Sequence, residues 1–188
     1  MTSTSPSNPQ IVLLFSGKRK SGKDFITERL LQRLTHERAQ IIRISEPIKR
    51  SWANKLGLDL RELLSDAPYK EKFRKEMIEW SDQRRAEDYG IFCREALIAA
   101  NREICIVSDV RRKSDIRYFK EVFGSKVKTV RIEANEQTRL ERGWLFQKGV
   151  DDVQSECDLD DMVDWDLLTS NDCGADVESI LDQICLLL

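Results

Sequence analysis

The sequence contains a single histidine, His36, among 188 residues. One histidine cannot build a histidine relay or a histidine metal cluster, so both kinds of site are excluded. His36 lies near the end of the first predicted helix, far in the sequence from the glycine-rich and arginine-rich segments. We therefore expect it on the surface.

The sequence also lacks a C-x-x-C motif. The five cysteines are odd in number and scattered, and none forms a C-x-x-C pair. Several lie inside apolar runs, where an unpaired cysteine behaves as a small hydrophobic residue. We expect reduced thiols in the core. The cysteines are Cys93, Cys105, Cys157, Cys173 and Cys185.

No excess of positive charge is present. Lysine and arginine total 31 against 33 acidic residues. This balance argues against the strongly basic surface that duplex nucleic acid requires, and it predicts no nucleic-acid partner. Local clusters of charge must therefore carry the functional information.

Long apolar runs and targeting segments are absent as well. No run approaches the roughly 20 apolar residues that cross a bilayer. The last three leucines match neither a prenylation box nor a peroxisomal tripeptide. Residues 1–10 are rich in Ser, Thr and Pro and lack the basic and apolar regions of a signal peptide. We expect a disordered lead-in at 1–10, no membrane partner, and a location in the cytosol.

The remaining composition suits one α/β domain with a single core over residues 11–188. Hydrophobic residues make up 40% and charged residues 34% of the chain. Short apolar runs predict buried strands, and runs with helical spacing alternate with them, which indicates a doubly wound parallel sheet. The predicted strands are 11–15, 41–44, 104–107 and 127–132, with a weaker fifth at 166–168 and a closing helix from Val177 to Leu188.

Two further segments have predicted roles. The helical region at about 47–101, opened by Pro47, should build the side of the site that holds the phosphoryl acceptor. The acidic, hydrophobe-poor loop from Gly149 to Asp161 predicts a mobile lid, which with the preceding helix spans about 139–161.

A phosphate-binding loop is the strongest motif. Residues 17–24, GKRKSGKD, fit G-x-x-x-x-G-K-[ST] except at the last position, and they lie between a predicted strand and a predicted helix. Gly17 and Gly22 permit a turn whose N–H groups point at phosphate oxygens, while Lys23 reaches the β- and γ-phosphates. The alternative is an ordinary glycine-containing turn.

The loop departs from the motif at Asp24, where Ser or Thr is usual. An aspartate brings a carboxylate, which Mg²⁺ accepts as a ligand; alternatively its charge only favours the helix N-terminus. Lys18, Arg19 and Lys20 add more cations than one triphosphate needs. We therefore expect a second anion at the loop.

A second cluster follows the strand at 104–107. Asp109, Arg111 and Arg112 stand at its carboxyl end, where open α/β sheets collect their ligands. Asp109 is a candidate Mg²⁺ ligand, and Arg111 is placed to stabilise charge on the moving phosphoryl group. A structural ion pair between Asp109 and Arg111 is the alternative.

Other cations suggest a phosphorylated acceptor. Lys70, Arg74, Ser81 and Arg85 recur at helical steps as a basic stripe, Arg131 ends a strand, and Arg139 and Arg142 share a helix face. Solvated faces with nearby glutamates are the alternative for these helices. The sequence offers no obvious general base, and a phosphate monoester with a second pKa near 6 is already a dianionic nucleophile at neutral pH. The pattern therefore favours a phosphate group as acceptor.

The sequence resembles animal-type phosphomevalonate kinase. The resemblance runs from Ile11 to about Asn171. It is carried by the loop LLFSGKRKSGKD at 13–24, YKE at 69–71, FRK at 73–75, FCR at 92–94, VSD at 107–109 with Arg111 and Arg112, RGW at 142–144, GVDD at 149–152 and SEC at 155–157.

The resemblance implies a nucleoside-monophosphate-kinase-like, three-layer fold and transfer of the ATP γ-phosphate to 5-phosphomevalonate, in isoprenoid and sterol precursor synthesis. ATP and Mg²⁺ are the implied cofactors. By residue, it implies that Lys18, Arg19, Lys20, Ser21, Gly22, Lys23, Asp24 and Asn171 bind ATP, that Lys23 and Arg111 are catalytic, and that Lys70, Arg85, Arg112, Arg131 and Arg142 hold the acceptor.

Two alternatives stay open. One is another P-loop kinase, such as a nucleotide kinase. The other is a non-catalytic nucleotide-binding module, against which the joint presence of Lys23, Asp109 and Arg111 speaks. A monomer is the default expectation.

Overall fold

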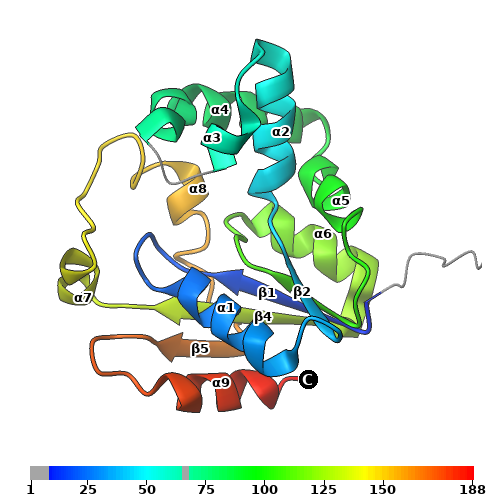
Figure 1. Ribbon diagram of the computed structural model, residues 1–188, viewed down its shortest axis with the longest axis vertical. Helices are drawn as coiled ribbons and strands as arrows, with labels where there is room; N and C mark the ends of the chain where they lie inside the picture. The colour runs from blue at the N-terminus through cyan, green and yellow to red at the C-terminus, as the bar shows by residue number, and fades with distance from the viewer. Residues whose placement is uncertain (1–8, 65–67) are drawn as a thin grey trace, which may run out of the picture.

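The computed structural model describes residues 9–64 and 68–188, apart from the side chains of Pro68, Lys70 and Glu71. Its described strands form a five-stranded parallel sheet in the order β2-β3-β1-β4-β5 (Figure 1). Each strand is a short apolar run buried by layers on both faces, as expected of parallel sheets. The strands are β1 (Ile11–Ser16), β2 (Ala39–Ile42), β3 (Ile104–Val107), β4 (Val127–Glu133) and β5 (Leu167–Ser170).

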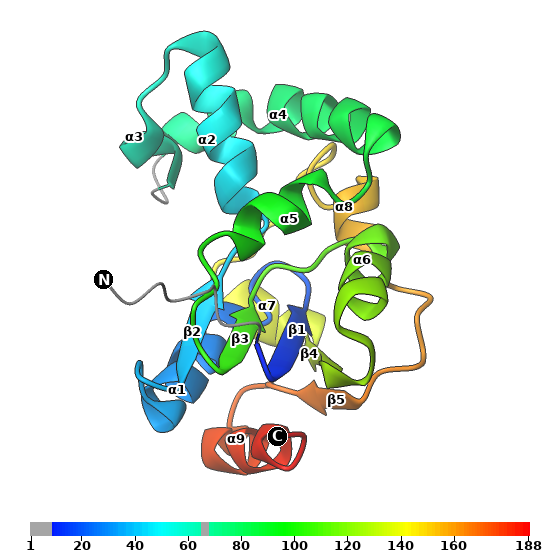
Figure 2. The ribbon, with the colours of Figure 1, turned by 90° about the vertical axis from the view of Figure 1, so that its right-hand side faces the viewer.

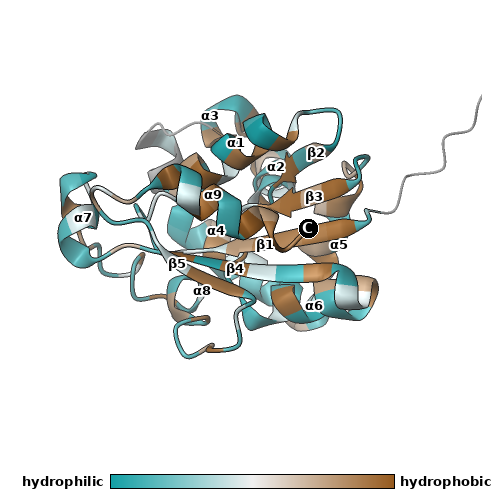
Figure 3. Ribbon diagram, turned by 90° about the horizontal axis from the view of Figure 1, so that it is seen from below, coloured by the Kyte–Doolittle hydropathy of each residue, from teal (hydrophilic) through white to brown (hydrophobic). Residues whose placement is uncertain are grey.

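Helices cover both faces of the sheet (Figure 3). On one face, α1 (Lys23–Leu34) and α9 (Val177–Cys185) pack on Leu13 and Phe15 of β1. On the other, α5 (Ile91–Leu97) and α6 (Lys113–Phe123) pack on Val12 and Leu14. Alternate residues of one strand thus enter opposite hydrophobic clusters. The predicted doubly wound, three-layer α/β fold is confirmed.

Three helices form a separate group to one side of the sheet (Figures 1 and 2). It consists of α2 (Ser45–Leu56), α3 (Leu60–Leu64) and α4 (Pro68–Glu87). Trp52, Leu63 and Met77 form a third cluster there, and Trp80 packs against both this cluster and the core beneath the sheet. Where one core was expected, the described residues thus form three clusters. The remaining short elements are η1 (Gly124–Lys126), α7 (Glu136–Glu141) and α8 (Gln154–Cys157).

Two predicted strand positions were wrong by a few residues. The second strand ends at Ile42 because Ile44 already leads into α2, whose first turn contains Pro47. Proline fits a first turn, where its missing N–H would have no partner. The fifth strand begins at Leu167, not Asp166, because the Asp166 carboxylate accepts bonds from the backbone N–H and Oγ1 of Thr129, both at 2.8 Å.

The expectation of core thiols holds for only part of the set. Cys93 and Cys105 are buried, and burial raises the pKa of Cys105 to about 12, so this thiol stays protonated at neutral pH. Cys157 and Cys173 are exposed because they lie on α8 and on the loop after β5. His36 is exposed, as expected. None of the helices formed by the described residues has both the length and the apolar character to cross a bilayer.

The core predicts a large stability effect at Phe119, which is fully buried on α6 and contacts the rings of Tyr118 and Phe123. We expect Phe119→Ala to lower the free energy of unfolding by about 3–5 kcal/mol, since it removes a buried ring and leaves a cavity. Urea denaturation measures this loss. Val122→Ala, at a half-exposed position of the same helix, should change it by less than about 0.5 kcal/mol. Equal effects of the two changes would contradict this account of the core.

Candidate active site

The predicted phosphate loop joins β1 to α1, and its two glycines are required by close contacts. A Cβ on Gly17 would lie 2.6 Å from the carbonyl oxygen of Ile132, and one on Gly22 would lie 2.2 Å from Nδ2 of Asn171. Gly22 also has φ +85°, in the left-handed region that glycine favours. Gly22 caps α1 without a side-chain acceptor. The first N–H groups of this twelve-residue helix therefore retain their capacity to bind an anion.

Lys23 is the first residue of α1 and is buried. Its Nζ donates to the carbonyl oxygen of Ser108 and to Oδ1 of Asp24, both at 2.5 Å. Burial lowers the pKa of Lys23 below its usual value; Asp24 opposes this shift, and Arg111 adds to it. The carboxyl end of β3 and the loop thus share one electrostatic environment.

Asp24 presents an ionised carboxylate to solvent. Its side chain is 73% exposed. Burial raises the pKa of Asp24, but the charge and hydrogen bond of Lys23 outweigh this and lower it below its usual value, with help from Arg43 and Arg111. An exposed carboxylate oxygen is a ligand type that Mg²⁺ prefers.

Two residues from the second half of the chain hold the loop from outside. Arg142 donates through Nη1 to the carbonyl oxygens of Lys20 (3.3 Å) and Ser21 (3.0 Å), and through Nη2 to that of Asn171 (2.7 Å). Nδ2 of Asn171 donates to the same Ser21 oxygen at 2.9 Å. Arg142, which is predicted for the acceptor side, therefore lies against the predicted phosphate loop.

The carboxylate of Asp109 is hydrogen-bonded to the backbone at the start of α2. Its two carboxylate oxygens accept the backbone N–H groups of Ile44 (2.7 Å) and Ser45 (2.9 Å). These bonds tie the carboxyl end of β3 to α2, the first helix of the predicted acceptor side. The alternative ion pair with Arg111 is not found among the described residues, in which Arg111 pairs with Glu156 of α8 instead.

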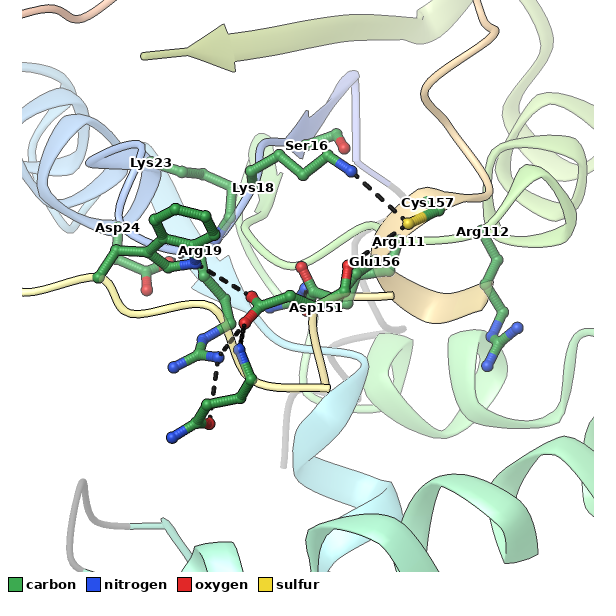
Figure 4. A network of polar contacts seen from close by, with 12 residues as sticks. Ser16, Lys18, Arg19, Lys23, Asp24, Arg111, Arg112, Asp151, Glu156 and Cys157 are labelled. Carbon is green, nitrogen blue, oxygen red and sulfur yellow. Dashed lines mark hydrogen bonds and ion pairs between the residues drawn. The ribbon is translucent and has the colours of Figure 1, made fainter. Parts of the chain in front are cut away.

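Carboxylates of the predicted lid contact the cations of the site (Figure 4). Asp151 pairs with Arg19 at 2.9 Å, Asp160 pairs with Lys18 at 2.5 Å, and Glu156 pairs with Arg111. The Asp151 and Glu156 side chains are only 8% and 6% exposed. The excess of loop cations predicts a second anion at the loop. In the structure, carboxylates of the predicted lid contact part of that positive charge.

The remaining predicted acceptor residues lie in different places. Arg131 is buried, donates to Oγ of Ser16 at 2.9 Å and pairs with Asp160 at 3.1 Å. Arg112 points away from the other labelled cations in Figure 4 and pairs with Asp82 of α4. Arg85 is paired with the buried Asp115. Lys70 belongs to α4, but its side chain lies outside the described part of the structure.

A cavity of about 460 Å³ lies beside the phosphate loop, between β4, α7 and the predicted lid. This volume can hold a small molecule. A second cavity, about 10 Å³, lies between Gly17, Arg111 and Glu156 and has room for about one water. The larger cavity is lined by Lys18, Arg131, Ile132, Glu133, Ala134, Asn135, Arg139, Asp160, Ser170 and Asp172.

Several carboxylates of the site could not be assigned a role from the sequence. Asp151, Glu156 and Asp160 were part of an acidic lid, but their pairing with particular cations was not predicted. Asp115 was missed entirely. Its position three residues after Arg112, at the start of a helix, fits a side chain that accepts backbone N–H groups, and this spacing was the available signal.

Comparisons with known proteins identify the family. The family model described as phosphomevalonate kinase matches residues 15–125, more than half of the chain. The chain belongs to the phosphomevalonate kinase family. A phosphomevalonate kinase of Drosophila melanogaster is 55% identical over 184 residues, which cover 93% of this chain and 97% of that protein.

The fold is shared more widely than the family. The crystal structure of shikimate kinase from Aquifex aeolicus VF5 aligns with a TM-score of 0.52, covering 94% of this chain and 95% of that one. Its sequence identity is 14%, so the likeness concerns the fold alone. This phosphomevalonate kinase family member thus has a P-loop kinase fold.

The contacts of Asp151 in the predicted lid indicate that Asp151→Ala will raise the amide hydrogen-exchange rate nearby. Asp151 accepts from Nε1 of Trp144 (3.1 Å) and from the backbone N–H of Gln147 (2.8 Å), besides pairing with Arg19. Removing the carboxylate should speed amide hydrogen exchange at Gln147 by roughly tenfold, since a charge-assisted bond protects it. Asp152→Ala is the matched control, because Asp152 accepts from the N–H of Gly149 instead. Unchanged exchange at Gln147 in Asp151→Ala would contradict the described lid geometry.

Proposed function

We propose that this chain transfers the γ-phosphate of ATP to 5-phosphomevalonate, giving 5-diphosphomevalonate and ADP. The observation that carries the proposal is its 55% identity to a phosphomevalonate kinase across nearly the whole chain. The site supports it, because Lys23, Arg111 and the loop cations gather around one end of the sheet. The reaction would serve isoprenoid and sterol precursor synthesis in the cytosol, with the protein acting as a monomer.

The proposed mechanism rests on charge and position. Residues 17–24 and Asn171 bind ATP, and Lys23 contacts the β- and γ-phosphates. Arg111 stabilises charge on the phosphoryl group in transfer. The acceptor phosphate attacks as a dianion, so no general base is required. Lys70, Arg85, Arg112, Arg131 and Arg142 remain the residues proposed for the acceptor side, with Arg142 acting there through the loop that it holds.

Mg²⁺ fits this donor set in part. Asp24 offers an exposed, ionised carboxylate beside Lys23, whereas both oxygens of Asp109 already accept backbone N–H groups. Among the described residues, no group of three or more His, Cys, Asp or Glu could hold a metal. Mg²⁺ is commonly held by one or two carboxylates together with substrate phosphates, and it neutralises phosphate charge when bound. We propose Asp24 as the direct ligand and retain Asp109 as a ligand through water.

The test is ADP release by the purified protein with Mg²⁺ and ATP, offering 5-phosphomevalonate, mevalonate and nucleoside monophosphates separately. We expect turnover with 5-phosphomevalonate alone. Turnover with a nucleotide would overturn the acceptor and favour a nucleotide kinase. Tight ATP binding without turnover on any acceptor would favour a non-catalytic nucleotide-binding module.

A further inference from the structure

Two crossed ion pairs connect α4 to the turn between β3 and α6. Arg112 in the turn pairs with Asp82 of α4, and Arg85 of α4 pairs with Asp115 of α6 at 2.6 Å. Asp82 and Arg85 are three apart and so lie on one face of α4. We call these four residues the α4–α6 joint. Helix α4 contributes Asp82 and Arg85, and the turn with the start of α6 contributes Arg112 and Asp115.

Asp115 is the most enclosed member of the joint. Its side chain is 1% exposed, and its neighbours donate to both oxygens. Oδ1 accepts from Arg85, while Oδ2 accepts the backbone N–H groups of Arg111 (3.3 Å) and Arg112 (3.2 Å). Cys93 of α5 lies 3.7 Å from Oδ1 through its Sγ. One carboxylate therefore holds the backbone of Arg111 and the side chain of an acceptor-side arginine together.

The surroundings make this arrangement rigid. The Arg85 guanidinium lies over the ring of Phe92, 5.3 Å from its centroid, and is only 10% exposed. A buried arginine packed on a ring and paired with a buried carboxylate has little freedom to rotate. The opposite side of the same turn carries the Arg111 side chain, which lies in the electrostatic environment of Lys23.

We propose that Asp115 is a positioning residue for phosphoryl transfer, which sets Arg111 and the acceptor-side helix α4 in one fixed relation. Asp115 touches neither the phosphate loop nor Lys23 in the contacts of the described residues, so it acts through Arg111 and Arg85. In-line transfer between two polyanions depends on such a fixed relation, because small displacements of the reacting groups cost large factors in rate. The inference rests on the proposed function, since it assigns α4 to the acceptor.

The experiment is a double-mutant cycle on steady-state kinetics, preceded by wild-type turnover with 5-phosphomevalonate. Failure of that first measurement would refute the proposed acceptor and not the joint, and the cycle would then use whichever acceptor turns over. In Asp115→Asn we expect kcat to fall, because Arg111 is displaced, and the KM for the acceptor to rise roughly tenfold, while the KM for ATP changes by less than about threefold.

The cycle separates positioning from stability. Arg111→Lys lowers turnover by some factor in wild type. In the Asp115→Asn background this factor should be at least about fivefold smaller, because Arg111 is already displaced there. Asp166→Asn is the matched control, since Asp166 also accepts a backbone N–H but at Thr129, and its effect should be additive with Arg111→Lys. Additive effects of Asp115→Asn and Arg111→Lys would overturn the proposal.

A second variant covers the case in which Asp115→Asn does not fold. Asp82 is 40% exposed, so Asp82→Asn removes the charge of the other pair of the joint at a solvent-accessible position, and the amide oxygen can still accept from the Arg112 side chain, which is 9% exposed. The same non-additivity with Arg111→Lys is expected, with a smaller magnitude. Additivity in this cycle would equally overturn the proposal.

Discussion

Lys23→Met should fold normally and lose turnover by roughly a thousandfold or more, as expected when the contact to the β- and γ-phosphates is removed. Methionine is unbranched, only one heavy atom shorter than lysine, and apolar, which suits the buried environment of this side chain. The lost ammonium leaves Asp24 without its 2.5 Å partner, but Asp24 is exposed and can be solvated. Single-turnover kinetics with saturating ATP measure the effect.

Lys120→Met is the control for this change, because Lys120 is exposed on α6 and contributes nothing to the site. It should retain wild-type turnover. Circular dichroism and thermal unfolding should show the same fold in both variants. Near-normal turnover in Lys23→Met would refute the mechanism. Among the described residues, Lys18, Arg19 and Lys20 of the loop are not buried, so none of them takes the place of Lys23.

Arg111→Gln should lower kcat by roughly a thousandfold while the KM for ATP changes little. A cation that acts on the transferring phosphoryl group contributes mainly in the transition state, where such arginines supply about 10³–10⁵ in rate. The substitution also leaves Glu156 of α8 without its partner. The kcat and both KM values, measured across the two substrates, check the prediction.

Arg117→Gln provides the matched control. Arg117 lies on α6 and pairs with Glu121 at 2.8 Å on the exposed surface, so its loss should leave kcat unchanged. A rise in the KM for ATP without a change in kcat would contradict a transition-state role for Arg111. It would instead assign Arg111 to ground-state nucleotide binding.

The sequence predicted the parts of the fold that depend on local pattern. The apolar runs at 104–107 and 127–132 became β3 and β4, and the loop at 17–24 lies between β1 and α1 as its glycines indicated. These elements are readable because buried parallel strands and phosphate loops need particular residues at each position. Strand ends were harder to predict. The fifth strand begins after Asp166, because the Asp166 carboxylate is bound by Thr129, which lies 37 residues away in the sequence.

The candidate site was predictable in its cations and not in their partners. Arg85, Arg112 and Arg142 were identified as charged groups near phosphates, but the sequence did not show that Asp115, Asp82 and the loop carbonyls bind them. The fold brings these partners together across 30 to 122 residues of sequence. Sequence spacing reports faces of one helix and not contacts between elements.

The support of the phosphate loop by Arg142 and Asn171 bears on how the protein is made. Asn171 contacts a loop residue that precedes it by 150 positions, and β1 pairs with strands that follow it by about 90 and 115 residues. A ribosome therefore synthesises the loop well before the residues that hold it. The loop therefore lacks these contacts until Asn171 has been synthesised, and ATP bound at the loop can stabilise the complete fold only after Asn171 has emerged.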